Sequence, residues 1–200
     1  MIVGLVPAAG TSSRMGRPKL PMLVGGRPLI ERVVSALRLG GADRVVVIAP
    51  PVGVEGSIEM ATIADRAGAE VVALGSPSLD MRETFLAGLF VIRRKAIPSA
   101  ILLTPGDCPN IDAKLVARLV ELAREAPDRI IAPAYAGRRG HPIVLPWALA
   151  EQAGGLEPGV GINTLIERHA GLVSEVPVDD PDLHADIDTP EDLARWNAGR

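Results

Sequence analysis

Short, mostly apolar segments that alternate with segments of helical period constrain the fold of this chain more than any other feature of its sequence. The apolar segments are a few residues long, rich in β-branched side chains, and fall at residues 2–6, 44–48, 70–74, 100–103 and 129–132. Continuous apolarity over so few residues is typical of strands buried on both faces of a parallel sheet. Because parallel strands must be joined by crossover connections, we expect the helical segments between them to form those connections. The pattern predicts a three-layer α/β/α, doubly wound fold with a mostly parallel sheet.

Capping signals mark the ends of several predicted helices. Asp80 with Glu83 resembles a capping box that opens one helix, and Asp112 is placed to cap the next. Thr189 as cap, with Pro190 at the first helical position, begins the last helix. These signals support the alternation of strand and helix.

The alternation changes after residue 132, where glycine- and proline-rich turns interrupt the chain. We interpret residues 134–180 as an insertion that covers the ligand crevice and holds the second substrate. Two further strands are predicted, over residues 173–178 and 185–187. Since no linker composition divides the chain, we expect residues 1–200 to form a single domain.

Composition excludes several classes of protein. Hydrophobic residues make up 48% of the chain, charged residues 22%, and the net charge is −3, which argues against a disordered chain or a basic nucleic-acid coat protein. The single cysteine, Cys108, predicts a reducing compartment and no structural zinc. The first residues lack a basic targeting region, and no apolar run approaches the roughly 20 residues that span a bilayer. We therefore expect a soluble, cytoplasmic protein with no nucleic-acid or membrane partner.

The charges are segregated along the chain. Residues 1–42 contain six basic residues against one acid, whereas residues 174–192 contain eight acids and no lysine or arginine. One interpretation is two solvated faces. The other is a cleft with one cationic and one carboxylate wall, suited to a polyphosphate and a divalent metal.

The strongest chemical signal is the loop after the first predicted strand, Pro7-Ala-Ala-Gly-Thr-Ser-Ser-Arg-Met-Gly-Arg-Pro-Lys19. Small residues directly after a buried strand let backbone amides approach a ligand. Arg14, Arg17 and Lys19 add three cations within the same loop. The combination suits a triphosphate, although the loop is neither a P-loop nor a dinucleotide-binding G-x-G-x-x-G sequence.

Carboxylates accompany two of the later predicted strands. Asp107, in Gly106-Asp-Cys-Pro, follows a buried strand and is expected to point into the crevice, where it can bind Mg²⁺. Asp186 and Asp188 alternate on the short predicted strand and would share one face. Either of them could complete a metal site with Asp107.

These segments together resemble a known family. The glycine loop is similar to the signature A-A-G-x-x-x-R-M-G-x-x-K of the nucleotidyltransferase superfamily that includes the MobA/MocA-like molybdenum cofactor nucleotidylyltransferases and the sugar-phosphate nucleotidyltransferases. The segments Gly106-Asp-Cys-Pro and Asp186-Ile-Asp-Thr-Pro-Glu-Asp also look like family segments. The resemblance implies a Rossmann-like nucleotide-diphospho-sugar transferase fold. It also implies Mg²⁺-dependent transfer of a nucleotide monophosphate from an NTP to a phosphorylated acceptor, with release of pyrophosphate.

The resemblance assigns roles to residues of the loop and of the acidic segments. Arg14 and Lys19 are the expected catalytic residues, with Asp107 and Asp188 as metal ligands and Asp186 as the fallback for Asp188. The residues expected to contact the nucleotide are Ala8, Ala9, Gly10, Thr11, Ser12, Ser13, Gly16, Thr84 and Gly106.

Substrate identity is less well defined. Arg139-Gly-His-Pro resembles the cytidylyltransferases for molybdopterin, which favours CTP as donor and makes Arg139 and His141 candidates for acceptor binding. Arg82 and Glu83 replace serines of the segment that contacts the nucleotide in relatives, which leaves base selectivity open. If the acceptor is molybdopterin, a partner enzyme that receives the product is expected. The alternatives are a sugar-phosphate or isoprenoid-precursor nucleotidyltransferase and, in another class, a non-catalytic nucleotide-binding regulatory module.

Overall fold

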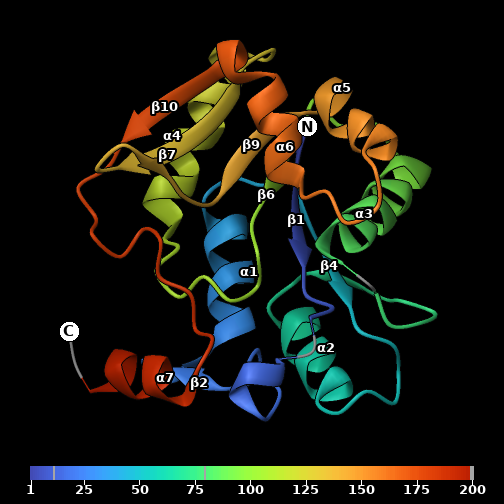
Figure 1. Cartoon of the computed structure of the whole chain (residues 1–200), viewed down its shortest axis with the longest axis vertical. Coiled ribbons are helices and arrows are strands. Elements are labelled where there is room, and N and C mark those ends of the chain that lie inside the picture. Colours follow the sequence, from blue (N-terminus) through green and yellow to red (C-terminus); the bar gives the residue numbers. More distant parts are fainter. Residues whose placement is uncertain (11, 79, 199–200) are drawn as a thin grey trace.

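The computed structural model describes residues 1–10, 12–78 and 80–198, and its central feature is a mixed sheet with helices on both faces (Figure 1). The strands of the sheet follow the order β10-β7-β9-β6-β1-β4-β5, with β8 beside β7. They are β1 (Ile2–Pro7), β4 (Arg44–Ala49), β5 (Glu70–Ala73), β6 (Ala100–Leu103), β7 (Ile130–Tyr135), β8 (Arg138–Arg139), β9 (Ile143–Pro146) and β10 (Val173–Pro177). Among the described strands of this sheet, β8 and β9 run antiparallel to their neighbours and the other pairs are parallel. A separate two-stranded pair is formed by β2 (Leu23–Val24) and β3 (Arg27–Pro28).

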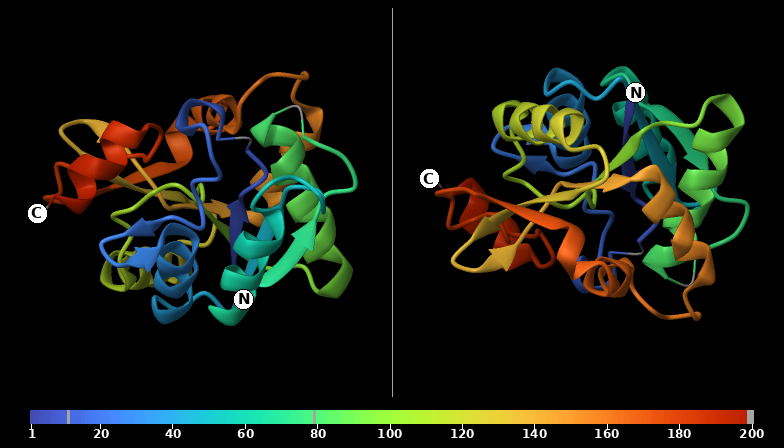
Figure 2. Two further views of the ribbon diagram at one scale, coloured as in Figure 1. Left: turned by 90° about the horizontal axis from the view of Figure 1, so that it is seen from below. Right: turned by 90° about the horizontal axis from the view of Figure 1, so that it is seen from above.

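Two groups of helices cover the two faces of the sheet (Figure 2). One face carries α1 (Leu29–Leu39), α2 (Ser57–Arg66) and α4 (Ala113–Glu125). The other carries α3 (Met81–Lys95), α5 (Trp147–Ala150) and α6 (Ile162–Arg168), and α7 (Pro190–Asn197) packs beside β2. Successive residues of β1 enter opposite cores: Val6 lies in the first and Leu5 in the second, and both are fully buried. The predicted three-layer, doubly wound fold is confirmed. No helix in the described part of the chain is long and apolar enough to cross a membrane.

The sheet topology places a ligand crevice at one point. From β1 the chain proceeds to β4 and β5 on one side and then returns to β6 on the other. A doubly wound sheet binds its ligands where the strand order reverses in this way, outside the carboxyl ends of the strands. The loops that follow β1 and β6 meet there, and they carry the glycine-rich sequence and Asp107.

The predicted helix caps are present. Asp80 accepts a hydrogen bond from the amide of Glu83, and Asp112 caps α4 in the same way. Thr189 and Asp192 form a complete capping box at the start of α7. Helix α2 had no capping signal in the sequence because its N-cap is Gly56, which has no side chain.

The short strand predicted over residues 185–187 is wrong. The segment has no strand partner among the residues that the structure describes. The amide of Ile187 instead donates a hydrogen bond to the carbonyl of Asp107 at 3.2 Å. Because β6 ends at Leu103, Asp107 lies in a loop and offers no ladder for a strand to extend. Asp186 and Asp188 therefore lie on an irregular segment.

The segment over residues 134–180, expected as an insertion, is partly built into the scaffold. It supplies β9, which lies between β6 and β7 in the sheet, and β10, which pairs with β7 at the edge. The segment therefore shapes the sheet beside Asp107 as well as any acceptor-side surface. Its role in acceptor binding stays a prediction.

Gly40, directly after α1, permits close packing of α1 on α4. A Cβ at this position would overlap the side chain of Val116 and lie 2.9 Å from the carbonyl oxygen of Ala113. Since φ of Gly40 is −83°, alanine is allowed by the backbone and only the contact opposes it. We expect Gly40→Ala to lower the free energy of unfolding by about 1–3 kcal/mol in urea denaturation, the usual cost of overpacking.

The matched control for this prediction is Gly171→Ala, where a Cβ meets nothing within 4 Å. This variant should stay within about 0.5 kcal/mol of the parent. Equal stability of the two variants would contradict the packing role of Gly40.

Candidate active site

A cavity of about 170 Å³ lies at the carboxyl ends of β1 and β6, and we call it the central cavity. Its lining includes many of the predicted site residues: Ala8, Gly10, Ser12, Arg14, Lys19, Gly106, Asp107 and Asp188. The chain supplies these residues from the loop after β1, the loop after β6 and the segment before α7. The fold thus brings together three parts of the sequence that were predicted separately.

Lys19 joins the two predicted metal carboxylates. Its Nζ lies 2.6 Å from Oδ2 of Asp107 and 2.7 Å from Oδ1 of Asp188, and its side chain is only 13% exposed. Burial alone would lower the pKa of Lys19, but the charges and hydrogen bonds of Asp107 and Asp188 outweigh it and raise that pKa above its ordinary value. The ammonium group is therefore charged throughout the neutral pH range.

Arg14 adds a second cation at the rim of the central cavity. Its Nη2 lies 2.7 Å from Oδ2 of Asp188, while most of its side chain is exposed. An exposed guanidinium paired at one end can turn toward an anionic ligand at small cost, because surface ion pairs contribute little free energy. The cationic and carboxylate segments of the sequence meet in this cavity through Arg14, Lys19 and Asp188.

The loop after β1 is held in shape by its own backbone and by β4. The amide of Ala8 donates to the carbonyl of Ile48, so Ala8 anchors the loop and its N–H is already engaged. Ser12 has φ of 51°, which is uncommon for a residue with a side chain, and its Oγ accepts from the amide of Lys19. Gly16 also has positive φ, at 70°.

Other predicted residues of this loop contribute less to what can be described. Ser13 begins a short 3₁₀ turn, Ser13–Met15, and Ala9 is buried in the loop. Thr11, a predicted nucleotide contact, lies outside the described residues.

A third carboxylate lies beside the other two. Ligand atoms of Asp107, Cys108 and Asp186 all lie within 4.8 Å of one another, and the Cys108 thiol is 3.7 Å from Oδ1 of Asp186. Burial, with the charges of Asp107 and Asp186, raises the pKa of the Cys108 thiol well above its usual value, so the sulfur stays protonated. Partial burial and the nearby charges of Asp107 and Asp188 raise the pKa of Asp186. Because like charges repel, the ionised forms of Asp107, Asp186 and Asp188 destabilise one another unless a cation lies between them.

The donor set fits a hard divalent metal. Mg²⁺ prefers oxygen ligands such as carboxylates. One carboxylate oxygen of Asp107 and one of Asp188 contact the same cation, the ammonium of Lys19. Asp186 lies beside Asp107 and Cys108 in the same cluster. Asp188 as the second ligand, with Asp186 as the fallback, stays a prediction.

A second cavity, which we call the α3 cavity, adjoins the glycine loop on the side of α3. It is lined by Pro7, Ala9, Gly10, Ser78, Asp80, Met81 and Thr84. Thr84 is buried, and its hydroxyl lies 3.1 Å from that of Ser78, so the protein itself supplies a partner for this predicted nucleotide contact. Sequence reasoning used Asp80 only as a helix cap and missed Ser78. The signal available in the sequence was the position of Asp80 at the N-cap of α3, the helix whose first residues line this cavity together with the glycine loop.

A third cavity, the hairpin cavity, lies beside β8 and α6 and contains the two predicted acceptor residues. Its polar lining includes Arg138, Arg139, His141, Asn163 and Glu167. The Nδ1 atom of His141 is buried and has no hydrogen-bond partner in the described part of the chain. Burial lowers the pKa of His141, although the charge of Asp107 acts in the opposite direction, so the imidazole is neutral at neutral pH. Arg139 is exposed and lies 3.8 Å from Glu175.

Comparisons with known proteins found a matching family model and similar curated proteins. A family model described as the MobA-like NTP transferase domain matches residues 4–173. A phosphoenolpyruvate guanylyltransferase of Rubrobacter xylanophilus is 32% identical, over 98% of this chain and 92% of its own length. A molybdenum cofactor guanylyltransferase of Rhizobium meliloti is 27% identical, over 97% and 89% of the two chains.

Solved structures share the fold. Rv0371c from Mycobacterium tuberculosis superposes with a TM-score of 0.82 at 22% identity, and the match covers all of both chains. A further structure of Rv0371c, in complex with manganese, has a TM-score of 0.72 over 100% of this chain and 99% of its own. The arrangement of strands and helices described above is therefore one that solved proteins adopt.

Proposed function

Because the chain belongs to the MobA-like NTP transferase family and is a nucleotidyltransferase, we propose that it transfers a nucleotide monophosphate to a small phosphorylated acceptor. A phosphate oxygen of the acceptor attacks the α-phosphorus of the NTP, the bond to the β-phosphate oxygen breaks, and pyrophosphate leaves. The observation that carries the proposal is the contact of Lys19 with both Asp107 and Asp188 in the central cavity. Such transfer requires mainly positioning and charge stabilisation, which this cluster offers.

In this proposal the cations hold the triphosphate. Lys19 and Arg14 neutralise its charge, and Lys19 stabilises the charge that develops on the α-phosphate. Ala9 and Gly10, which have no bulky side chains, let the nucleotide approach the loop. Nucleotidyltransferases of this family typically use a divalent metal, and Asp107 and Asp188 would hold Mg²⁺ here. The ion would supply further neutralisation of phosphate oxygens.

The proposed donor is GTP. The Arg139-Gly-His-Pro segment favoured CTP from the sequence, but the two curated relatives described above are guanylyltransferases that align over nearly the whole chain. The α3 cavity supports a purine, since it has about 330 Å³ and the carboxylate of Asp80 in its lining. Each carboxylate oxygen of Asp80 already accepts one backbone amide, from Glu83 and from Gly159, and keeps a second lone pair. These lone pairs can accept the paired N1–H and N2–H donors of guanine, whereas a carboxylate offers no donor to the acceptor atoms of cytosine.

The proposed acceptor site is the hairpin cavity. Its volume is about 320 Å³, and Arg138 and Arg139 supply positive charge for a phosphate or carboxylate. His141 shortly precedes β9, which pairs with β6, and the loop after β6 carries Asp107. Phosphoenolpyruvate and the molybdenum cofactor, the acceptors named for the relatives, are both phosphorylated. For the second of them a delivery partner enzyme belongs to the proposal.

Thermal unfolding with each NTP tests the donor. We expect GTP with Mg²⁺ to raise the melting temperature more than CTP, UTP or ATP, because a ligand at 100 times its Kd stabilises by about 2.7 kcal/mol. Pyrophosphate release with GTP is then measured against phosphoenolpyruvate, molybdopterin, a sugar phosphate and a phosphorylated isoprenoid precursor. A larger shift with CTP would overturn the donor. A protein that binds NTP and releases no pyrophosphate with any acceptor would be a regulatory module.

A further inference from the structure

The loop after β6 and the segment before α7 are joined by several contacts outside the sheet. The amide of Ile187 donates to the carbonyl of Asp107 at 3.2 Å, and the thiol of Cys108 lies 3.7 Å from Asp186. One of the joined segments carries Asp107 and the other carries Asp188. The distance between these carboxylates therefore depends on contacts between two irregular segments.

Asn110 makes two further contacts between these parts of the chain. Its Nδ2 donates to Oδ2 of Asp180 at 3.1 Å and also to the carbonyl of Asp182. The other carboxylate oxygen of Asp180 accepts from the amide of Asp182 at 3.0 Å. One side-chain amide thus closes a turn that lies 70 and 72 residues further along the chain. The turn leads directly into the segment with Asp186 and Asp188.

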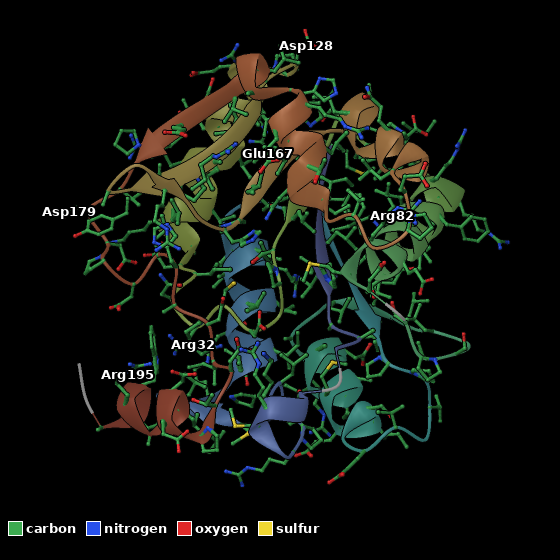
Figure 3. The ribbon with its side chains drawn as sticks, viewed as in Figure 1. Arg32, Arg82, Asp128, Glu167, Asp179 and Arg195 are labelled. Atoms are coloured by element: carbon green, nitrogen blue, oxygen red, sulfur yellow. The ribbon has the colours of Figure 1, made fainter. Side chains whose placement is uncertain are left out.

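The opposite side of the same loop is fixed by α1. Arg32 donates through Nε and Nη2 to the carbonyl of Pro109, at 3.2 and 3.0 Å, and through Nη1 to Val24 (Figure 3). A loop held by two bonds from one guanidinium has little freedom to move toward the turn. The hydrogen bonds of Asn110 therefore place the turn on the loop.

We propose that Asn110 is a positioning residue for the metal-binding carboxylates: by fixing the turn at residues 180–182, it sets the placement of Asp188 opposite Asp107. The inference rests on the proposed metal role of Asp107 and Asp188. Groups that hold metal ligands in place usually contribute 10- to 100-fold to metal affinity or activity. No ladder of strand hydrogen bonds does this here, because the segment at 185–187 has no strand partner in the described structure.

The test measures Mn²⁺ affinity directly, by electron paramagnetic resonance of free Mn²⁺, so it does not depend on turnover. Asn110→Ala is expected to weaken Mn²⁺ binding about tenfold or more. GTP binding in the presence of chelator should be unchanged, since Asn110 lines none of the three cavities described above. Turnover of the variant should approach that of the parent as Mn²⁺ is raised.

Asn197→Ala is the matched control. The Asn197 side chain also joins distant segments by two hydrogen bonds, accepting from the amide of Gly25 at 2.8 Å and donating to the carbonyl of Leu23 at 3.0 Å. These two hydrogen bonds link α7 to the β2–β3 pair, whereas those of Asn110 link the loop after β6 to the turn at residues 180–182. We expect this variant to keep the parent's Mn²⁺ affinity, even if its unfolding midpoint falls. An equal loss of affinity in both variants would overturn the inference, as would parent-like affinity in Asn110→Ala.

Asp180→Ala is a second test of the inference, because it removes the carboxylate that accepts the hydrogen bond of Asn110. If Asn110 and Asp180 act through their mutual hydrogen bond, combining Asn110→Ala with Asp180→Ala should lower the Mn²⁺ affinity no further than the more damaging single substitution does. Additive losses would overturn the inference. Failure of the proposed function looks different: Asp107→Asn would then leave Mn²⁺ binding of the otherwise unchanged protein intact.

Discussion

Lys19→Ala is expected to lower kcat at least about a hundredfold, the scale of losing one charge-stabilising donor in an active site. The loss corresponds to about 2.7 kcal/mol of transition-state stabilisation. Lys19 is singled out because its ammonium contacts both carboxylates of the central cavity and its side chain is largely buried, which gives its charge a fixed place. The measurement is pyrophosphate release at saturating GTP, Mg²⁺ and acceptor.

The control is Lys114→Ala, which removes an exposed lysine from α4. It should turn over like the parent. Although burial lowers the pKa of Lys19, Asp107 and Asp188 raise it above its ordinary value, so titration of this ammonium should not appear in the pH profile of the parent near neutrality. Near-normal turnover of Lys19→Ala would remove this lysine from the mechanism. Lys19→Arg is not a neutral change, since a planar fork replaces a compact point charge.

The sequence was informative wherever function depends on the ends of regular strands. The glycine loop and Asp107 each follow a buried run, and a doubly wound sheet places such ends along one edge. Their convergence in one cavity therefore follows from strand order, which the alternation of segments predicted. Asp188 joined them by family resemblance, and the structure places its carboxylate 2.7 Å from Lys19.

The sequence failed where side chains, not backbone ladders, set the path of the chain. Alternating acids at 186 and 188 gave a strand pattern, but this segment pairs with no strand that the structure describes. A side-chain hydrogen bond between Asn110 and Asp180 joins the turn before it to the loop after β6. Periodicity carries no signal for a single side-chain bond between distant loops. Within residues 134–180, interpreted from the sequence as an insertion, the apolar run of β9 pairs with β6 in the sheet.

The segregation of charge along the sequence indicated only part of the candidate active site. The two charged segments do meet at Lys19 and Asp188, yet other members find partners close by in sequence. Arg27 pairs with Glu31 one helical turn away, and Arg195 pairs with Asp192 within α7. Pairs of this kind stabilise a helix surface modestly and indicate no ligand. Charge counts therefore locate a site only when the fold brings the charges into one cavity.

Asp107→Ala is expected to match the loss in Lys19→Ala, at least about a hundredfold in kcat, by a different route. Asp107 contacts Lys19, and its carboxylate lies beside Cys108 and Asp186. Its removal leaves the proposed metal with one carboxylate opposite Lys19, so Mn²⁺ affinity should fall together with turnover. In Lys19→Ala, by contrast, Mn²⁺ affinity should not fall, because a competing cation has been removed.

Asp107→Ala should still fold, which makes this comparison usable. The bond from Ile187 goes to the backbone carbonyl of residue 107 and survives the substitution, and Lys19 keeps Asp188 as a partner. Asp128→Ala, at an exposed turn far from the cavity (Figure 3), controls for the loss of one negative charge. If both active-site variants lost turnover while Mn²⁺ binding changed in neither, the carboxylate would act on Lys19 alone. The opposite responses of metal affinity are therefore what separates a metal ligand from a partner of the lysine.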